Sequence, residues 1–111
     1  EKSLVFYEKA LGLTEKRRFV NEGKFILVYL WDGESDYELE LTWLNDWTKP
    51  YDLGDNEFHM AFAVEDKEEA HKLHQEMDVI IYENQDMDLY FIGDPDGYWI
   101  EILERGSDPT D

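Results

Sequence analysis

The sequence contains no cysteine and only three prolines among its 111 residues. Without cysteine there is no disulfide framework, no thiolate nucleophile and no cysteine-ligated metal site. No apolar run reaches the roughly 18–20 residues that a membrane-spanning helix needs, and no signal peptide is visible. These absences indicate a cytoplasmic, non-redox protein with no membrane partner.

Basic residues are scarce. Lysine and arginine number 10 against 28 aspartates and glutamates, which gives a formal net charge of −18. Nucleic acids bind proteins through lysine and arginine, so the charge excludes them as partners. It suits a bound cation, either a metal or a cationic ligand, and it equally suits a solvated acidic surface. The one basic cluster, Lys16-Arg17-Arg18, is expected on the surface of a strand.

The most informative feature that is present is an internal repeat. The stretch from Asp36 to Leu41 matches the stretch from Gly97 to Ile102, and Glu40 and Glu101 are 61 positions apart within it. Tyr29 and Tyr90 have the same spacing. Since glutamate, tyrosine and apolar positions all repeat, we interpret the chain as a duplication.

The repeat extends back through a helix in each copy. Residues 1–13 match residues 67–79 with a spacing of 66, and both stretches carry apolar residues at helical spacing. Gly12 is typical of a helix C-terminus, and Asp66 with Glu69 resembles a capping box at the start of the second helix.

The predicted fold class is α+β, built from two βαβββ modules, with the first strand of module one absent from this sequence. We expect a single domain over residues 1–111, divided into module one at 1–44, a linker at 45–57, module two at 58–105 and a tail at 106–111. The predicted helices are Lys2–Leu11 and Lys67–Met77. The predicted strands are Thr14–Val20, Lys24–Leu30 and Tyr37–Trp43 in the first module, and Phe58–Val64, Val79–Tyr82, Asp88–Ile92 and Tyr98–Leu103 in the second.

Three residues are candidates for a metal site. Glu101 lies between two isoleucines, where a solvated carboxylate fits poorly if both sheet faces are buried. Glu40 is its repeat equivalent, and His59 begins a strand whose equivalent in module one would lie before Glu1. Paired modules could thus bring two histidines and two glutamates together, a ligand set suited to Ni²⁺, Zn²⁺, Co²⁺ or Fe²⁺.

Each candidate also has an ordinary structural role to consider. His59 could be a half-buried strand histidine, and Glu40 could face solvent because Glu38 shares its face by the period of two. His71 and His74 are three residues apart on the second helix, a spacing that fits a ligand pair. A solvated helix face is the interpretation we adopt for these two histidines.

The chain resembles the vicinal oxygen chelate superfamily, the glyoxalase/bleomycin-resistance/dioxygenase fold. The resemblance covers residues 1–104 and is carried by the helix from Ser3 to Leu13, by Glu40-Leu41-Thr42, by the segment from Phe58 to Val64, and by the segment from Asp94 to Glu101. The Glu40-Leu41-Thr42 stretch is similar to the second metal ligand of the glyoxalase I (lactoylglutathione lyase) branch.

The resemblance implies functional residues as well as a fold. Glu40, His59 and Glu101 match three of the four metal ligands of that branch, and the fourth, a first-strand histidine, has no counterpart in this sequence. Asn45 matches a glutathione contact with a shift of one residue. Family sites are commonly shared across a homodimer, so we expect a dimer acting on a small molecule.

The function implied is metal-dependent isomerisation of a 2-oxoaldehyde–thiol hemithioacetal to a 2-hydroxyacyl thioester. Glu101 is the expected base and Glu40 its symmetric partner, with Ni²⁺ or Zn²⁺ as metal and glutathione or another thiol as co-substrate. Two alternatives stay open: another metal enzyme of the fold, such as an epimerase acting beside a thioester carbonyl, and a metal-free, bleomycin-resistance-like binding dimer.

Overall fold

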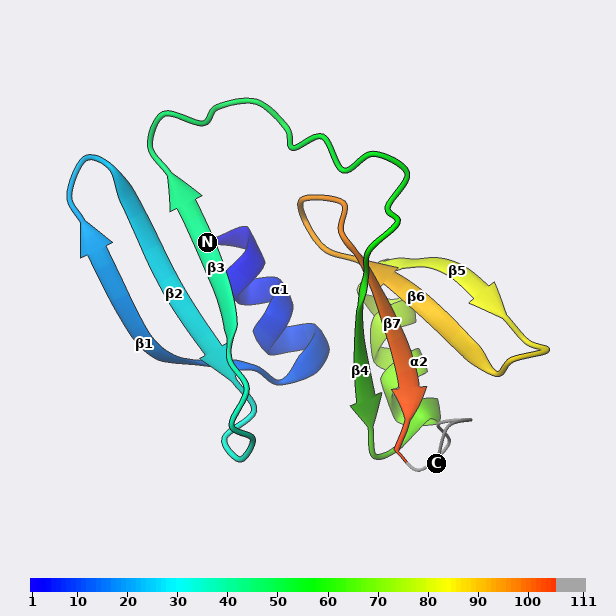
Figure 1. Cartoon of the computed structure of the whole chain (residues 1–111). Helices are drawn as coiled ribbons and strands as arrows, with labels where there is room; N and C mark the ends of the chain where they lie inside the picture. The colour runs from blue at the N-terminus through cyan, green and yellow to red at the C-terminus, as the bar shows by residue number, and fades with distance from the viewer. Residues whose placement is uncertain (106–111) are drawn as a thin grey trace. The chain divides into compact units, whose positions relative to one another are not determined.

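The computed structural model describes residues 1–105, and the chain divides into two compact units, Glu1–Tyr51 and a second that begins at Asp52. Each unit combines one helix with one sheet (Figure 1). The predicted α+β class is therefore confirmed. The predicted tail at residues 106–111 lies outside the described residues.

The first unit contains one helix and a three-stranded antiparallel sheet. Its elements are α1 (Lys2–Leu11), β1 (Thr14–Asn21), β2 (Phe25–Trp31) and β3 (Leu39–Leu44), and the strand order is β1-β2-β3. The helix and its C-terminal turn contribute Phe6, Tyr7, Ala10 and Leu13 to the core, and β2 contributes Val28 and Leu30. Gly12 ends α1 in the left-handed conformation, with φ of 69°, as its position in the sequence predicts.

The second unit contains one helix and a four-stranded sheet. Its elements are β4 (Met60–Val64), α2 (Lys67–Glu76), β5 (Ile80–Asn84), β6 (Leu89–Gly93) and β7 (Trp99–Glu104), in the order β4-β7-β6-β5. Only β4 and β7 pair in parallel. The Asp66 carboxylate accepts a hydrogen bond from the backbone N–H of Glu69 at 3.2 Å, which confirms the predicted cap of α2.

Six predicted strands begin later than the sequence pattern indicates, four of them by one residue and two by two residues. The strand predicted from Phe58 begins at Met60, and Phe58 is 90% exposed. The strand predicted from Tyr37 begins at Leu39, because Tyr37 belongs to the preceding loop, where its carbonyl accepts a hydrogen bond from the Ser35 hydroxyl. Both strands are therefore shorter than predicted, because the aromatic residues at their predicted starts belong to the preceding loops.

In β6 the structural repeat is shifted by one residue relative to the repeat seen in the sequence. Tyr29 pairs across the sheet with Glu40, whereas the residue opposite Glu101 is Phe91. The identical spacing of Tyr29 and Tyr90 is therefore not a structural equivalence. Residues of β6 lie 62 positions after their structural equivalents in β2, whereas residues of β7 lie 61 positions after theirs in β3. Tyr90 therefore points to the other face of its sheet and is buried beside α2.

His74 does not lie on a solvated helix face, and that interpretation of the sequence was wrong. The side chain is fully buried, and its Nδ1 lies 2.8 Å from the Tyr90 hydroxyl. His71 is partly exposed and its Nε2 lies 2.6 Å from the Glu83 carboxylate. His74 is buried because Tyr90 supplies a polar partner within the core.

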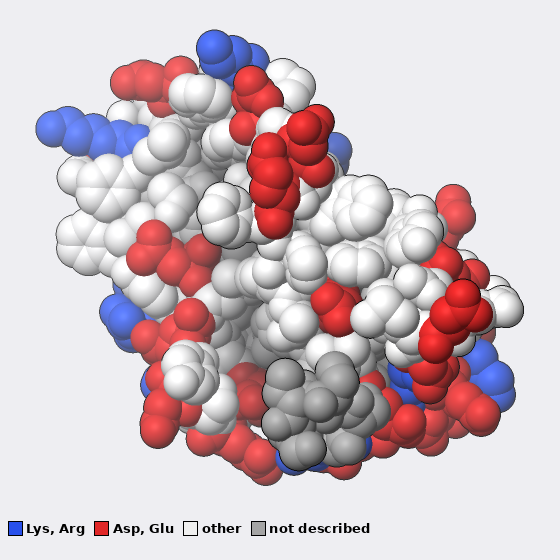
Figure 2. Space-filling model, turned by 45° about the vertical axis from the view of Figure 1, so that its right-hand side comes forward, with Lys and Arg blue, Asp and Glu red and all other residues white. Residues whose placement is uncertain are grey.

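Acidic residues dominate the surface. Figure 2 shows red acidic side chains spread over one face, with basic ones far fewer. Lys16, Arg17 and Arg18 are all exposed on β1, so the predicted surface position of this cluster is confirmed. No helix in residues 1–105 is both long and apolar enough to cross a bilayer.

We predict that Tyr90→Phe destabilises the second unit by about 1–3 kcal/mol, because it removes a hydroxyl partner from a buried imidazole. Tyr37→Phe is the matched control, since this side chain is 85% exposed. Urea unfolding of both variants measures the difference. Equal unfolding free energies for Tyr90→Phe and the wild type would contradict the role given to the His74–Tyr90 contact.

Candidate functional site

The alternation of β7 places Glu101 on the sheet face opposite the core. Ile100 and Ile102 have no exposed surface, whereas the side chain of Glu101 is 17% exposed. Since successive side chains of a strand point to opposite faces, burial of the two isoleucines turns Glu101 outward. Trp99 and Leu103 share that partly exposed face.

A tight turn fixes the start of this strand. The Asp94 carboxylate accepts hydrogen bonds from the backbone N–H groups of Asp96 and Tyr98, both at 2.9 Å. Gly97 has a φ of 92°, which a side chain disfavours, and its N–H donates to the Asp94 carbonyl. The Asp-Pro-Asp-Gly segment therefore sets where β7 begins and which residues face outward.

His59 and Glu101 form a close pair in the second unit. His59 directly precedes β4, and Ala61 of β4 is paired with Glu101 in the parallel ladder. Residues 59 and 61 share a face by the period of two, so His59 reaches the same face as Glu101. The His59 Nε2 and Glu101 Oε1 atoms are 2.9 Å apart.

A cluster of aromatic rings begins beside His59. The ring of His59 meets the ring of Phe91 edge-on, with centroids 5.0 Å apart, and Phe91 in turn lies 5.3 Å from Trp99. Tyr82 packs beside both of these rings. The cluster thus lies on the same half of the sheet as the His59–Glu101 pair.

The pair suits a borderline divalent metal ion. Imidazole nitrogen and carboxylate oxygen are both ligands of Zn²⁺ and Ni²⁺, at bond lengths of about 2.0–2.2 Å. Two such ligand atoms are about 2.9 Å apart at the right angle of an octahedral ion and about 3.3 Å apart at the tetrahedral angle of zinc. The observed separation of 2.9 Å between Nε2 and Oε1 is that of a hydrogen bond, and it places both atoms within reach of one ion.

Glu40 has a different environment on β3 of the first unit. Its cross-strand partner is Tyr29, and Thr42 Oγ1 donates to Glu40 Oε1 at 2.9 Å. Hydrogen bonds from Tyr29 and then Thr42 hold the pKa of Glu40 below its ordinary value. The lowered pKa keeps Glu40 a carboxylate, which accepts a hydrogen bond from the Thr42 hydroxyl.

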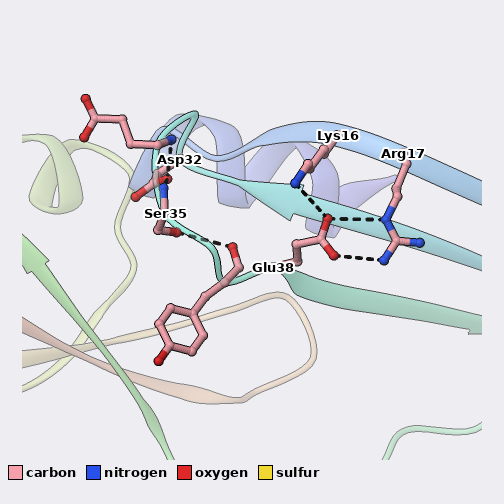
Figure 3. Close-up of polar contacts among 7 residues, drawn as sticks. Lys16, Arg17, Asp32, Ser35 and Glu38 are labelled. Atoms are coloured by element: carbon pink, nitrogen blue, oxygen red, sulfur yellow. Dashed lines mark hydrogen bonds and ion pairs between the residues drawn. The ribbon is translucent and has the colours of Figure 1, made fainter.

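A basic group lies beyond Tyr29 on the same sheet. The Arg17 guanidinium stacks over the Tyr29 ring at 3.7 Å, and Glu38 holds it through two hydrogen bonds of 2.9 and 3.3 Å. Lys16 completes the cluster at 3.4 Å from Glu38 (Figure 3). The pKa of Glu38 is lowered chiefly by its hydrogen bonds with Arg17.

The predicted site residues are only partly brought together. His59 and Glu101 meet, while Glu40 belongs to the first unit, and residues 1–105 contain no group of three or more potential metal ligands. Asn45 follows β3, is exposed, and donates its backbone N–H to the Lys24 carbonyl. The glutathione contact assigned to Asn45 and the ligand roles of the other three residues stay predictions.

Sequence reasoning missed Tyr29, Arg17 and Phe91 as neighbours of the two glutamates. Their cross-strand positions depend on register, which shifts at a bulge between Glu15 and Arg17 in β1. The face on which Tyr29 lies could have been predicted, because the period of two along β2 places Tyr29 on the same face as Leu27 and Trp31. Nothing in the sequence pattern indicated that Phe91, rather than Tyr90, faces Glu101.

Comparison with known proteins identifies the family. The profile of the Glyoxalase/Bleomycin resistance protein/Dioxygenase superfamily matches residues 1–102. The chain belongs to this superfamily. Two relatives that this chain covers over more than four fifths of their length support the glyoxalase branch within it. A lactoylglutathione lyase of Neisseria meningitidis is 33% identical over 96% of this chain and 83% of its own. A probable lactoylglutathione lyase of Synechocystis is 30% identical over 96% and 88%.

A solved structure agrees with these sequence relatives. The trypanothione-dependent glyoxalase I of Leishmania major has a TM-score of 0.81 and 36% identity, covering 93% of this chain and 76% of that one. The superfamily membership explains the repeat, because the units carry the βαβββ pattern with only its first strand lacking in the first unit. These relatives support a glyoxalase I-like enzyme.

The loop that leads to Glu40 is held by one carboxylate. Asp32 Oδ1 accepts hydrogen bonds from the backbone N–H groups of Ser35 at 2.8 Å and Glu34 at 2.9 Å (Figure 3). These bonds, that of Ser35 first, lower the pKa of Asp32 below its ordinary value of 3.8. Asp32 therefore orders the turn between β2 and β3 while it is ionised.

We predict that Asp32 titrates below 3.8 in the folded protein, as NMR of its carboxyl carbon would measure. Because the folded-state pKa is depressed, the stabilisation is present above the unfolded-state pKa and is lost as pH falls through the folded value. Asp32→Asn, which keeps an acceptor oxygen but cannot titrate, should lose that pH dependence. A titration midpoint at or above 3.8 would contradict the prediction.

Proposed function

We propose that the protein is a metal-dependent, lactoylglutathione lyase-type isomerase. Its reaction converts the hemithioacetal of a 2-oxoaldehyde and a thiol into a 2-hydroxyacyl thioester. The observation that carries the proposal is the His59–Glu101 pair, 2.9 Å apart on one sheet face, in a chain whose relatives include lactoylglutathione lyases. The proposed metal ligands are Glu40, His59 and Glu101.

The reaction moves one proton between adjacent carbons. A divalent ion bound at the site, Ni²⁺ or Zn²⁺, would supply Lewis acidity to the two neighbouring substrate oxygens. Glu101 is the proposed base: it removes the proton from the carbon that bears sulfur and delivers it to the adjacent carbonyl carbon. The substrate hydroxyl proton passes to the other oxygen, so the product is an isomer of the hemithioacetal.

The neighbouring side chains support this role of Glu101. The His59 Nε2 lies 2.9 Å from the carboxylate, and Phe91 is the residue opposite Glu101 in the neighbouring strand. The Glu101 side chain is 17% exposed. Ala61, the residue paired with Glu101 in the parallel ladder, has only a methyl side chain. A base in a shielded position transfers protons with less competition from solvent.

The co-substrate is proposed to be glutathione or another thiol, with Asn45 as a contact. The glyoxalase I of Leishmania major is trypanothione-dependent by its title, so relatives differ in the thiol that they use. The formal charge of −18 disfavours an anionic thiol at long range. Rates with glutathione and with trypanothione, compared at low and high salt, would assign the thiol.

Assembly and location complete the proposal. We propose a homodimer in which each metal site takes Glu40 from one chain and His59 and Glu101 from the other. A dimer should appear in light scattering of the purified protein. The lack of cysteine suits the cytoplasm, where disulfides are rare.

We predict that the full-length gene product binds Ni²⁺ or Zn²⁺ and isomerises the methylglyoxal–glutathione or methylglyoxal–trypanothione hemithioacetal. Glu101→Gln should lower kcat by about 10²–10⁴-fold, the usual contribution of a positioned base. Glu104→Gln, at the exposed end of the same strand, is the matched control. An unchanged kcat in Glu101→Gln would contradict the proposal that Glu101 is the base.

We also predict that His59→Ala reduces bound metal, measured by mass spectrometry of the purified protein. His71→Ala is the control, since His71 contacts Glu83 in the same unit and lies outside the proposed ligand set. Failure of the wild type to bind metal, even with added Ni²⁺, would overturn the lyase proposal and favour a metal-free binding protein.

A further inference from the structure

Two basic side chains that follow one another in β1, Lys16 and Arg17, reach the same face of the first sheet. The cross-strand register shifts between Glu15 and Arg17, so Lys16 is the extra residue of a bulge. In a regular strand two successive side chains point to opposite faces, whereas a bulge redirects one of them. The bulge therefore brings these two residues, the basic pair, together.

Aromatic rings of β2 support the basic pair. The Lys16 ammonium lies 4.3 Å from the centre of the Trp31 ring. The Arg17 guanidinium lies 3.7 Å from the centre of the Tyr29 ring. Trp31 and Tyr29 share one face by the period of two, and Leu30 between them is buried on the other face. Cation–π contacts thus hold both basic groups over the open face of the sheet.

A single carboxylate, that of Glu38, joins the basic pair. It accepts hydrogen bonds of 2.9 and 3.3 Å from the Arg17 guanidinium and lies 3.4 Å from the Lys16 ammonium (Figure 3). Two parallel N–H···O bonds are the geometry in which arginine recognises carboxylates. Glu38 precedes β3, which begins at Leu39, so its side chain can turn away without breaking the ladder.

The basic pair is accessible to an anion. The side chains of Arg17 and Lys16 are 57% and 39% exposed, whereas that of Glu38 is 21% exposed. Ion pairs between groups this exposed contribute little to stability. Two positive charges against one negative charge also leave the cluster net positive, in a chain whose formal net charge is −18. A carboxylate that approaches this face is therefore attracted at short range.

The second unit repeats the bulge without the charges. The register of β5 shifts between Ile80 and Tyr82, so Ile81 and Tyr82 occupy the positions of the basic pair. Trp99, the repeat equivalent of Glu38, contacts the Tyr82 ring with centroids 6.5 Å apart. Since apolar and aromatic residues fill these positions in one unit, the fold itself does not require cations there.

The basic pair lies close to the proposed metal ligand of the same unit. Arg17 is opposite Tyr29, and Tyr29 is opposite Glu40. Neighbouring strands are about 4.8 Å apart, so the backbones of Arg17 and Glu40 are about 10 Å apart on one face. A substrate whose reacting carbons lie at Glu40 can thus reach Arg17 with a charged group several bonds away.

We propose that Lys16 and Arg17 bind a carboxylate of the substrate, and that the Glu38 carboxylate occupies its place until the substrate arrives. The inference rests on the proposed function, because it takes the hemithioacetal as the ligand. The carboxylate belongs either to the thiol or to the side chain of the 2-oxoaldehyde. Binding exchanges one ion pair for another, and Glu38 turns to solvent.

Two variants that break the same ion pair separate this role from a structural one. If the pair only orders the loop before β3, Arg17→Gln and Glu38→Gln change ligand affinity in the same direction. If Glu38 competes with the substrate, Arg17→Gln weakens binding and Glu38→Gln strengthens it. Arg18→Gln is the matched control, because Arg18 lies opposite the core residue Val28 and pairs with Glu15 instead.

The experiment measures dissociation constants of two unreactive probes by isothermal titration calorimetry of the full-length gene product. S-methylglutathione carries its carboxylates on the thiol side, and (2-hydroxyethylthio)acetate carries one on the side that the oxoaldehyde supplies. The probe whose binding responds identifies the source of the carboxylate. For that probe we expect the dissociation constant to rise about tenfold or more in Arg17→Gln, to fall in Glu38→Gln and to stay unchanged in Arg18→Gln.

Three results would overturn the carboxylate site. These are equal affinities of the wild type and Arg17→Gln for both probes, changes of the same sign in Arg17→Gln and Glu38→Gln, and failure of both probes to bind the wild type. If Arg17→Gln fails to fold, Lys16→Gln still decides, since it removes the other cation of the site.

Bound Ni²⁺, measured on the same samples, tests the proposed function separately, because neither Glu38 nor the basic pair is a proposed metal ligand. Metal binding without a response to Arg17→Gln would overturn this inference and leave the lyase proposal intact. A response to Arg17→Gln in a protein that binds no metal would support the carboxylate site and overturn the lyase proposal.

Discussion

Alternation of side chains along the last strand of each unit is the constraint on which the rest depends. Burial of Ile100 and Ile102 directs Glu101 to the opposite face, and the half-buried Leu39 and Leu41 do the same for the exposed Glu40 in β3. A shift of one residue would bury a carboxylate in the core. The hydrophobic effect that assembles each sheet therefore also presents one glutamate per unit on the open face.

Equivalent positions have acquired different chemical surroundings. Glu40 lies opposite Tyr29 and accepts a hydrogen bond from Thr42, and its pKa is lowered, while Glu101 lies opposite Phe91 and beside His59. The duplicated fold thus places two carboxylates at equivalent strand positions but gives them different neighbours. Such a division suits a site that needs one fixed ligand and one group that moves a proton.

Much of the fold could be predicted from the sequence because its signals are local. Helical spacing, the cap at Asp66, the glycine at position 12 and the Asp-Pro-Asp-Gly turn each act within a few residues. His74 could not be placed correctly, because its burial depends on a hydroxyl from β6, distant in sequence. The pairing of Phe91, rather than Tyr90, with Glu101 likewise depends on register between strands. The three candidate ligands were found by repeat and resemblance, and only His59 and Glu101 lie within one unit.

The most direct test of the account is X-ray absorption at the nickel edge of the Ni²⁺-loaded, full-length gene product. The account predicts a first shell of nitrogen and oxygen only, with an imidazole contribution that falls in His59→Ala and an oxygen contribution that falls in Glu101→Ala. A nickel shell that is identical in the wild type and in both variants would contradict it, because the ion would then bind elsewhere.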